Sequence, residues 1–161
     1  MTATDEALLR RTFEIASNAQ QHGNMPFGAL LAGPDGAALL EMENGYFPDC
    51  DATAHAERLL ASAASKHYRA PFLAECTLYS SAEPCAMCAG AIYWTGIGRV
   101  VYGLSEHSLK ALTGDHPDNP TMDLPCRIVF QAGQRSIQVE GPLLEDEAAA
   151  LHQNAWAQEK P

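Results

Sequence analysis

Residues 76–94 read CTLYSSAEPCAMCAGAIYW. The apolar run at 76–79 predicts a buried strand, and residues 85–94 predict a helix. Pro84 suits the start of that helix, because a missing N–H costs nothing near the first helical position. Cys85 and Cys88 then lie three apart in the first turn and share one face. The positive end of the helix dipole favours thiolates there.

Working outward, the remaining chain alternates between helical and strand patterns. Apolar periodicity predicts helices over 5–21, 54–65 and 143–158. Short apolar runs predict strands over 27–32, 37–42, 99–102, 128–130 and 137–139. The Gly-Pro-Asp-Gly at 33–36 predicts a hairpin turn, and the proline-rich residues 114–125 predict loop. Thr53 is expected to cap the second helix and Gly103 to end the 99–102 strand. This alternation favours an α/β fold, a mixed sheet covered by helices.

The length of 161 residues predicts one domain spanning 1–161. Acidic residues outnumber basic ones 20 to 10, giving a net charge of −10. That balance disfavours a nucleic-acid partner, because gripping phosphates requires Lys- and Arg-rich surface. No apolar run is long enough to span a bilayer. The acidic N-terminus does not look like a secretory signal, so we expect a cytoplasmic protein.

Five cysteines, an odd number in a chain expected to be cytoplasmic, point to metal ligation or burial rather than disulfides. His55-Ala56-Glu57 joins Cys85 and Cys88 in this argument. Two thiolates and one imidazole suit a tetrahedral zinc ion, and three protein ligands leave the fourth position open, as in catalytic sites. A lone C-x-x-C is also typical of a redox pair or half a structural zinc site, and a lone His-x-Glu is commonly incidental. Their combination favours catalytic zinc.

Glu57 lies two residues from a predicted ligand but is not expected to be one. Zinc brings the pKa of a bound water to roughly 7. A neighbouring carboxylate can accept that proton, pass it to a ring nitrogen and then protonate a departing amine. The alternative, that Glu57 is an ordinary helix surface residue, fits its position poorly.

With these residues in place, the chain resembles the cytidine deaminase superfamily, whose zinc nucleobase deaminases carry H-x-E and P-C-x-x-C. It is most similar to the branch of bacterial guanine deaminases and tRNA adenosine deaminases. The matching segments are Pro-Phe-Gly-Ala at 26–29, Asn44, residues 51–57 and residues 78–94. The resemblance covers about residues 5–110 well and the tail weakly. It implies a three-layer α/β/α sandwich around a five-stranded mixed sheet, one Zn²⁺ per chain and a homodimer.

The resemblance also implies roles for individual residues. His55, Cys85 and Cys88 would bind zinc, and Glu57 would be the catalytic proton shuttle. Six further residues would contact the substrate: Asn44 by its amide, Ala56 by its backbone N–H, Phe27 and Trp94 as walls of the flat ring, and Asp115 or Asp118 as a loop acid.

Each substrate contact has a plainer interpretation. Asn44-Gly45 is also typical of a turn. Phe27 and Trp94 are equally consistent with core aromatics. Asp115 and Asp118 are equally consistent with solvated loop residues.

Details within the branch favour a small substrate. Phe27 and the aromatic pair Tyr93-Trp94 look like guanine deaminases, whereas residues 97–103 look more like the tRNA enzymes. Net charge decides against RNA. Some guanine deaminases close the partner's site with a swapped tail that ends in an aromatic residue. Here Trp156 is followed by residues 157–161, which contain no aromatic.

The leading hypothesis is therefore deamination of guanine to xanthine, with a small nucleobase or nucleoside as partner and no membrane. Other substrates remain open: cytosine, a nucleoside or an aminated triazine. A tRNA adenosine deaminase is a further alternative and would need a basic surface beside the pocket. A non-enzymatic, zinc-stabilised interaction domain is the last, and it would need a fourth protein ligand.

Overall fold

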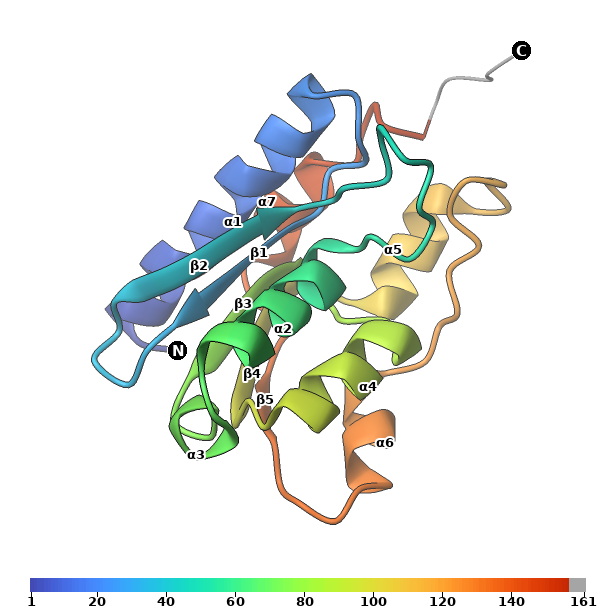
Figure 1. Ribbon diagram of the computed structural model, residues 1–161. Coiled ribbons are helices and arrows are strands. Elements are labelled where there is room, and N and C mark those ends of the chain that lie inside the picture. Colours follow the sequence, from blue (N-terminus) through green and yellow to red (C-terminus); the bar gives the residue numbers. More distant parts are fainter. Residues whose placement is uncertain (157–161) are drawn as a thin grey trace.

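A five-stranded sheet in the order β2-β1-β3-β4-β5 forms the middle layer of the protein (Figure 1). The computed structural model describes residues 1–156. The strands are β1 (Gly28–Ala32), β2 (Ala38–Glu43), β3 (Thr77–Ala82), β4 (Arg99–Leu104) and β5 (Gln138–Glu140). Strand β1 is antiparallel to β2 and β3, whereas β3, β4 and β5 run parallel. The sheet is therefore mixed, as predicted.

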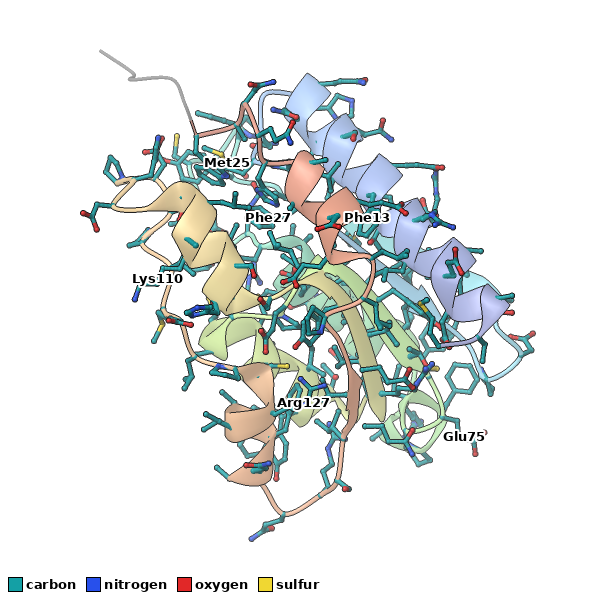
Figure 2. All side chains as sticks on the ribbon, turned by 180° about the vertical axis from the view of Figure 1, so that it is seen from behind. Phe13, Met25, Phe27, Glu75, Lys110 and Arg127 are labelled. Carbon is teal, nitrogen blue, oxygen red and sulfur yellow. The ribbon has the colours of Figure 1, made fainter. Side chains whose placement is uncertain are left out.

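Helices cover both faces of this sheet. One face carries α1 (Ala3–Gln21) and α7 (Glu145–Ala150), which lie in front in the reverse view (Figure 2). The other carries α2 (Ala56–His67) and α4 (Ala86–Thr95), with α6 (Cys126–Gln131) packed on α4 (Figure 1). Two short helices, α3 (Ala70–Leu73) and α5 (Glu106–Thr113), precede β3 and follow β4. No helix in residues 1–156 has the length and apolar character to cross a membrane.

Strand β1 shows why the core has two halves. Successive side chains of a strand point to opposite faces. Ala29 and Leu31 belong to the apolar cluster beneath α2 and α4, while Leu30 and Ala32 belong to the cluster beneath α1. Because both faces are covered, every residue of β1 is buried. The continuous apolar run at this position follows from that double burial.

Most elements predicted from the sequence are confirmed, including the first three helices, the hairpin and the strands that became β3, β4 and β5. Residues 114–125 contain no helix or strand, as predicted. The helices α3 and α5 were not predicted. The second helix is capped by His55 rather than Thr53, whose side chain instead donates to Asp51.

The predicted strand at 128–130 is wrong, because these residues lie inside α6. A three-residue apolar run does not distinguish a strand from one helical turn. Cys126 and Phe130, four residues apart, are the buried positions, and this is helical spacing.

The predicted helix 143–158 is too long, since α7 ends at Ala150. Turns follow, in which the Trp156 indole donates to His152 Nδ1 at 3.0 Å. Residues 157 and 158 of that prediction lie outside the described residues.

Gly103 lies inside β4 rather than at its end. A Cβ there would come within 2.9 Å of Phe13 Cε1 and 3.0 Å of the Ala148 side chain. Glycine at this position thus lets Phe13 of α1 and Ala148 of α7 pack closely on β4 (Figure 2).

A buried carboxylate ties the start of α1 to the sheet. Asp5 accepts hydrogen bonds from Arg99 at 2.8 Å and from the Tyr79 hydroxyl at 2.7 Å, and it forms a capping box with Thr2. Arg99 also pairs with Glu140 at 2.6 Å, so α1, β3, β4 and β5 share one network. The hydrogen bond from Arg99 is the main cause that holds the pKa of Asp5 well below its usual range.

Asp5→Asn is expected to lower the free energy of unfolding by about 2–3 kcal/mol at pH 7, because Arg99 loses its charged partner. A lowered folded-state pKa contributes stability above the unfolded value of about 3.9, and this contribution is lost as pH falls through the folded value. The difference between the native protein and the variant should therefore shrink below about pH 4. Urea unfolding at pH 7 and pH 3 measures it, with Asp49→Asn as the exposed control. An equal difference at both pH values would contradict this account.

Candidate zinc and active site

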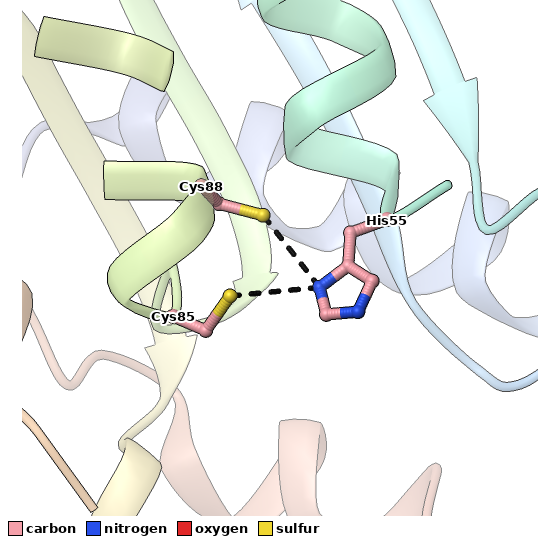
Figure 3. A group of neighbouring side chains, drawn as sticks. All are labelled: His55, Cys85 and Cys88. Carbon is pink, nitrogen blue, oxygen red and sulfur yellow. Dashed lines mark hydrogen bonds between the residues drawn. The ribbon is translucent and has the colours of Figure 1, made fainter. Parts of the chain in front are cut away.

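The predicted zinc ligands meet where two helices begin. His55 is the N-cap of α2 and Cys85 the N-cap of α4, with Cys88 one turn further along α4. These helices pack side by side on the sheet, so their N-termini adjoin. His55 Nδ1 lies 3.6 Å from both the Cys85 and Cys88 sulfurs (Figure 3). Within the described chain these three residues form the group able to hold a metal ion.

The donor set fits zinc. Zinc binds sulfur at about 2.3 Å and imidazole nitrogen at about 2.0–2.1 Å, so a tetrahedral ion holds these atoms roughly 3.6 Å apart. The observed sulfur–nitrogen distances agree. The pKa of Cys85 is lowered to about 4, chiefly by the hydrogen bond from the Cys88 thiol and also by His55. One ligand is therefore held as a thiolate, the form that binds metals.

Glu57 lies beside these ligands with its two oxygens in different surroundings. Oε1 accepts a hydrogen bond from the buried Ser80 hydroxyl at 2.6 Å, while Oε2 lies 3.5 Å from the Cys88 sulfur. The side chain is buried, and burial raises the pKa of the Glu57 carboxyl. Ser80 therefore fixes one oxygen and directs the other toward the predicted metal position.

A second buried acid organises the surrounding chain. Glu83 precedes Pro84 at the end of β3, and its carboxylate accepts the backbone N–H of Glu106 at 2.9 Å and of Cys126 at 2.8 Å. These are the first residues of α5 and α6. Glu83 thus holds the first residues of α5 and α6 near the turn between β3 and α4 that carries Cys85.

A cavity of about 610 Å³ opens over this group. His55, Glu57 and Cys85 lie on its wall, and Cys88 is buried behind them. Of the predicted substrate contacts, the cavity wall includes Phe27, Asn44 and Asp118. The structure therefore brings these three together with the ligand residues.

The other predicted contacts lie elsewhere in the single chain. Trp94 is 84% exposed near the end of α4, and Asp115 lines a separate, smaller hollow beside α5. The side chain of Ala56 is packed in the core, and its backbone N–H belongs to the first residue of α2, which has no acceptor within its own helix.

The cavity is acidic. Five of its lining residues are carboxylic acids and, within the described chain, none is Lys or Arg. The acids are Asp51, Glu57, Glu83, Glu106 and Asp118. A phosphate group would therefore meet no Lys or Arg side chain from residues 1–156 on this wall.

Residues 2–104 match the family described as the cytidine and deoxycytidylate deaminase zinc-binding region. This stretch is more than half of the chain and contains His55, Glu57, Cys85 and Cys88. The protein belongs to this deaminase family.

Three relatives show the breadth of this deaminase family. A probable cytosine deaminase of Schizosaccharomyces pombe is 36% identical over 156 residues, which are 97% of this chain and 94% of that protein. The guanine deaminase of Bacillus subtilis is 40% identical over 110 residues, 68% of this chain and 69% of that enzyme. A tRNA-specific adenosine deaminase of Haemophilus influenzae is 36% identical over 133 residues, 79% of this chain and 77% of that enzyme.

A solved structure extends the likeness to the fold. A variant of the protein NE0047 in complex with 8-azaguanine superposes with a TM-score of 0.80 and 27% identity, over 96% of this chain and 86% of that one. The α/β fold of this deaminase is therefore the cytidine deaminase-like fold expected from the sequence.

Two features of the deaminase site were not foreseen from the sequence. The first is Glu106, a buried residue on the cavity wall whose pKa is raised to about 8, mainly by burial, with Cys85 and Glu83 adding to the effect. Its only sequence signal is its place after a strand of the parallel part of the sheet, at the edge where ligands commonly bind.

The second feature is an aromatic cluster behind the cavity wall. The ring of Phe27 lies 5.2 Å from that of His152 and 6.3 Å from that of Trp156, and Trp156 also contacts His116 at 5.3 Å. Trp156 therefore supports the cavity wall of its own chain.

Proposed function

We propose that this deaminase acts hydrolytically on a free nucleobase and that its substrate is guanine, which gives xanthine and ammonia. The observation that carries the proposal is one acidic cavity, without Lys or Arg in the described chain, that joins Glu57 to the zinc-ligand residues. Its volume of about 610 Å³ lies in the usual range for small-molecule sites and accommodates a bicyclic base. The absence of Lys and Arg from the part of the wall formed by residues 1–156 favours an uncharged base over a nucleotide.

His55 Nδ1 and the sulfurs of Cys85 and Cys88 would hold one zinc ion. When bound, zinc supplies Lewis-acid activation of the water that attacks the ring carbon. The protein adds three ligands only, which leaves room for that water. Within the described chain the metal-binding group contains no fourth protein ligand, and this disfavours a purely structural zinc domain.

Glu57 would move the protons. Its Oε1 is fixed by Ser80, so Oε2 is the oxygen that takes a proton from the attacking water. The raised pKa of this buried carboxyl makes the protonated form accessible. Glu57 would then protonate the ring nitrogen next to the amine-bearing carbon, and later the departing amine.

Three side chains and one backbone group would hold the base. The Asn44 Oδ1 accepts the Tyr46 backbone N–H at 3.0 Å, which leaves its Nδ2 as a donor for the substrate. Phe27 would pack on the ring, Asp118 would be the loop acid, and the Ala56 N–H would donate to a substrate carbonyl. Trp94 and Asp115 lie outside this cavity in one chain, so they are not part of the proposed single-chain site.

Cytosine is the second candidate, because the similarity to the probable cytosine deaminase extends over nearly the whole chain. A tRNA substrate is disfavoured by the net charge of −10 and by the acidic cavity.

A substrate screen tests the proposal. Zinc-loaded protein should release ammonia from guanine faster than from cytosine, adenine, guanosine, cytidine or the triazine ammeline. An enzyme-coupled ammonia assay measures the rates, with metal-free protein as the blank. No turnover of guanine together with clear turnover of another base would overturn the choice of guanine.

We also propose a cytoplasmic homodimer. The five free cysteines support a reducing compartment. Trp94 on α4 is 84% exposed and Ile128 on α6 is 53% exposed, and a second copy could cover such large apolar side chains. A dimer formed through α4 would bring Trp94 of each chain into the interface.

A further inference from the structure

Glu106 is a buried acid whose side chain has no hydrogen-bond or ion-pair partner within residues 1–156. It is 4% exposed and lines the catalytic cavity at the start of α5. Its backbone N–H donates to Glu83, but its carboxyl group makes no hydrogen bond or ion pair anywhere in residues 1–156. Its oxygens are not among the fully enclosed, unpartnered side-chain atoms of residues 1–156, so they open onto the cavity, where a ligand can reach them.

The neighbouring acids Glu83 and Glu57 both have hydrogen-bond partners, unlike Glu106 within residues 1–156. Glu83 accepts two backbone N–H groups, and Glu57 is bound by Ser80. Glu106 lines the same cavity wall as Glu57 and Cys85. Its carboxyl is therefore an unused acceptor beside the reacting centre.

The structure offers no protein cation to satisfy this acceptor, since no Lys or Arg of the described chain lines the cavity. The cavity contents can supply the partner that residues 1–156 do not. A carboxyl oxygen accepts a hydrogen bond whether the group is ionised or protonated. The ring N–H groups of a nucleobase are donors of the matching kind.

We infer that Glu106 contacts the substrate and that its carboxyl group accepts a hydrogen bond from a ring N–H of the base. This inference rests on the proposed function. Asn44 would then donate a hydrogen bond to an acceptor of the base, and Glu106 would accept one from a ring N–H of the same base. A ring without that N–H would leave the Glu106 carboxyl without a partner. The site should therefore bind such a ring much more weakly than guanine.

Binding rather than turnover gives the direct test. Calorimetry on zinc-loaded Glu57→Gln protein measures guanine affinity without catalysis. Adding Glu106→Ala should weaken guanine binding by about 10- to 100-fold, as expected when a ring N–H loses its hydrogen-bond partner in a buried site. Glu106→Gln keeps an oxygen acceptor and should lose less. Glu75→Ala, at an exposed site away from the cavity, should bind as the parent does.

A comparison of N-methylated bases separates contact from a structural role. We expect 1-methyl-, 7-methyl- or 9-methylguanine to bind poorly to the parent when the methyl group replaces the contacted N–H. That penalty should disappear in the Glu106→Ala protein. The inference is overturned if all three penalties are the same in both proteins, or if Glu106→Ala binds guanine within about twofold of the parent.

Stability gives an independent check, because removing an unpartnered buried acid should not destabilise the protein. The Tm of Glu106→Gln should equal or exceed that of the native protein, and a drop of more than about 5 °C would assign Glu106 a structural role instead.

If the substrate screen identifies another base, the same binding comparison uses that base and its N-methyl derivatives. Binding of a base that is unaffected by Glu106 overturns this inference alone, whereas failure of every base to bind overturns the proposed function with it.

Discussion

Glu57→Gln is expected to reduce ammonia release by about 10²- to 10⁴-fold while the protein keeps its zinc. Glutamine has the shape of glutamate and can still accept the Ser80 hydrogen bond at Oε1. It cannot take up and return a proton at the position of Oε2, which faces the ligand residues. The substitution therefore removes proton transfer without removing the side chain from the cavity wall.

Two measurements on the same sample check this result. Metal analysis should give zinc equal to that of the native protein, and the ammonia assay should show little turnover. Glu75→Gln is the matched control at an exposed position and should retain activity. Sustained turnover by the Glu57→Gln protein would refute the proton-shuttle role.

Cys88→Ala is expected to lose both zinc and activity. Cys88 contributes one of three ligand atoms in the predicted metal group, and two remaining ligands hold zinc poorly. Losing a residue that only hydrogen-bonds a metal ligand typically lowers metal affinity about 10- to 100-fold. Losing Cys88, a ligand itself, should lower the affinity for zinc by more than this. Dialysis against a weak chelator followed by metal analysis measures the loss.

Cys76→Ala provides the matched control, because Cys76 is also a buried cysteine but lies outside the metal group. It should retain zinc. Full zinc occupancy in the Cys88→Ala protein would refute the ligand assignment, and zinc loss in both variants would point to general unfolding.

The zinc-ligand residues were predictable because they lie in two short sequence motifs. The spacing of Cys85 and Cys88 places both in one helical turn, and His55-x-Glu57 begins another helix. Most strands and helices were predictable for the same reason, since apolar periodicity is a local signal, although a three-residue run such as 128–130 does not distinguish a strand from a helical turn.

The rest depends on contacts that the sequence does not display. The path of residues 114–125 places Asp118 on the cavity wall and Asp115 outside it, although the two are three residues apart. Glu106 becomes notable only when the fold buries it without a partner. The three apolar residues at 128–130 became helical because their neighbours pack on α4.

In the zinc-dependent hydrolysis of guanine proposed for this protein, the carbon–amine bond breaks and a carbon–oxygen bond to water forms. The most direct measurement is mass spectrometry of the product formed by zinc-loaded protein in ¹⁸O-labelled water. We expect xanthine that carries one ¹⁸O atom and an equal amount of ammonia, with no product from metal-free protein. No xanthine, xanthine without the label, or equal product from metal-free protein would contradict the claim.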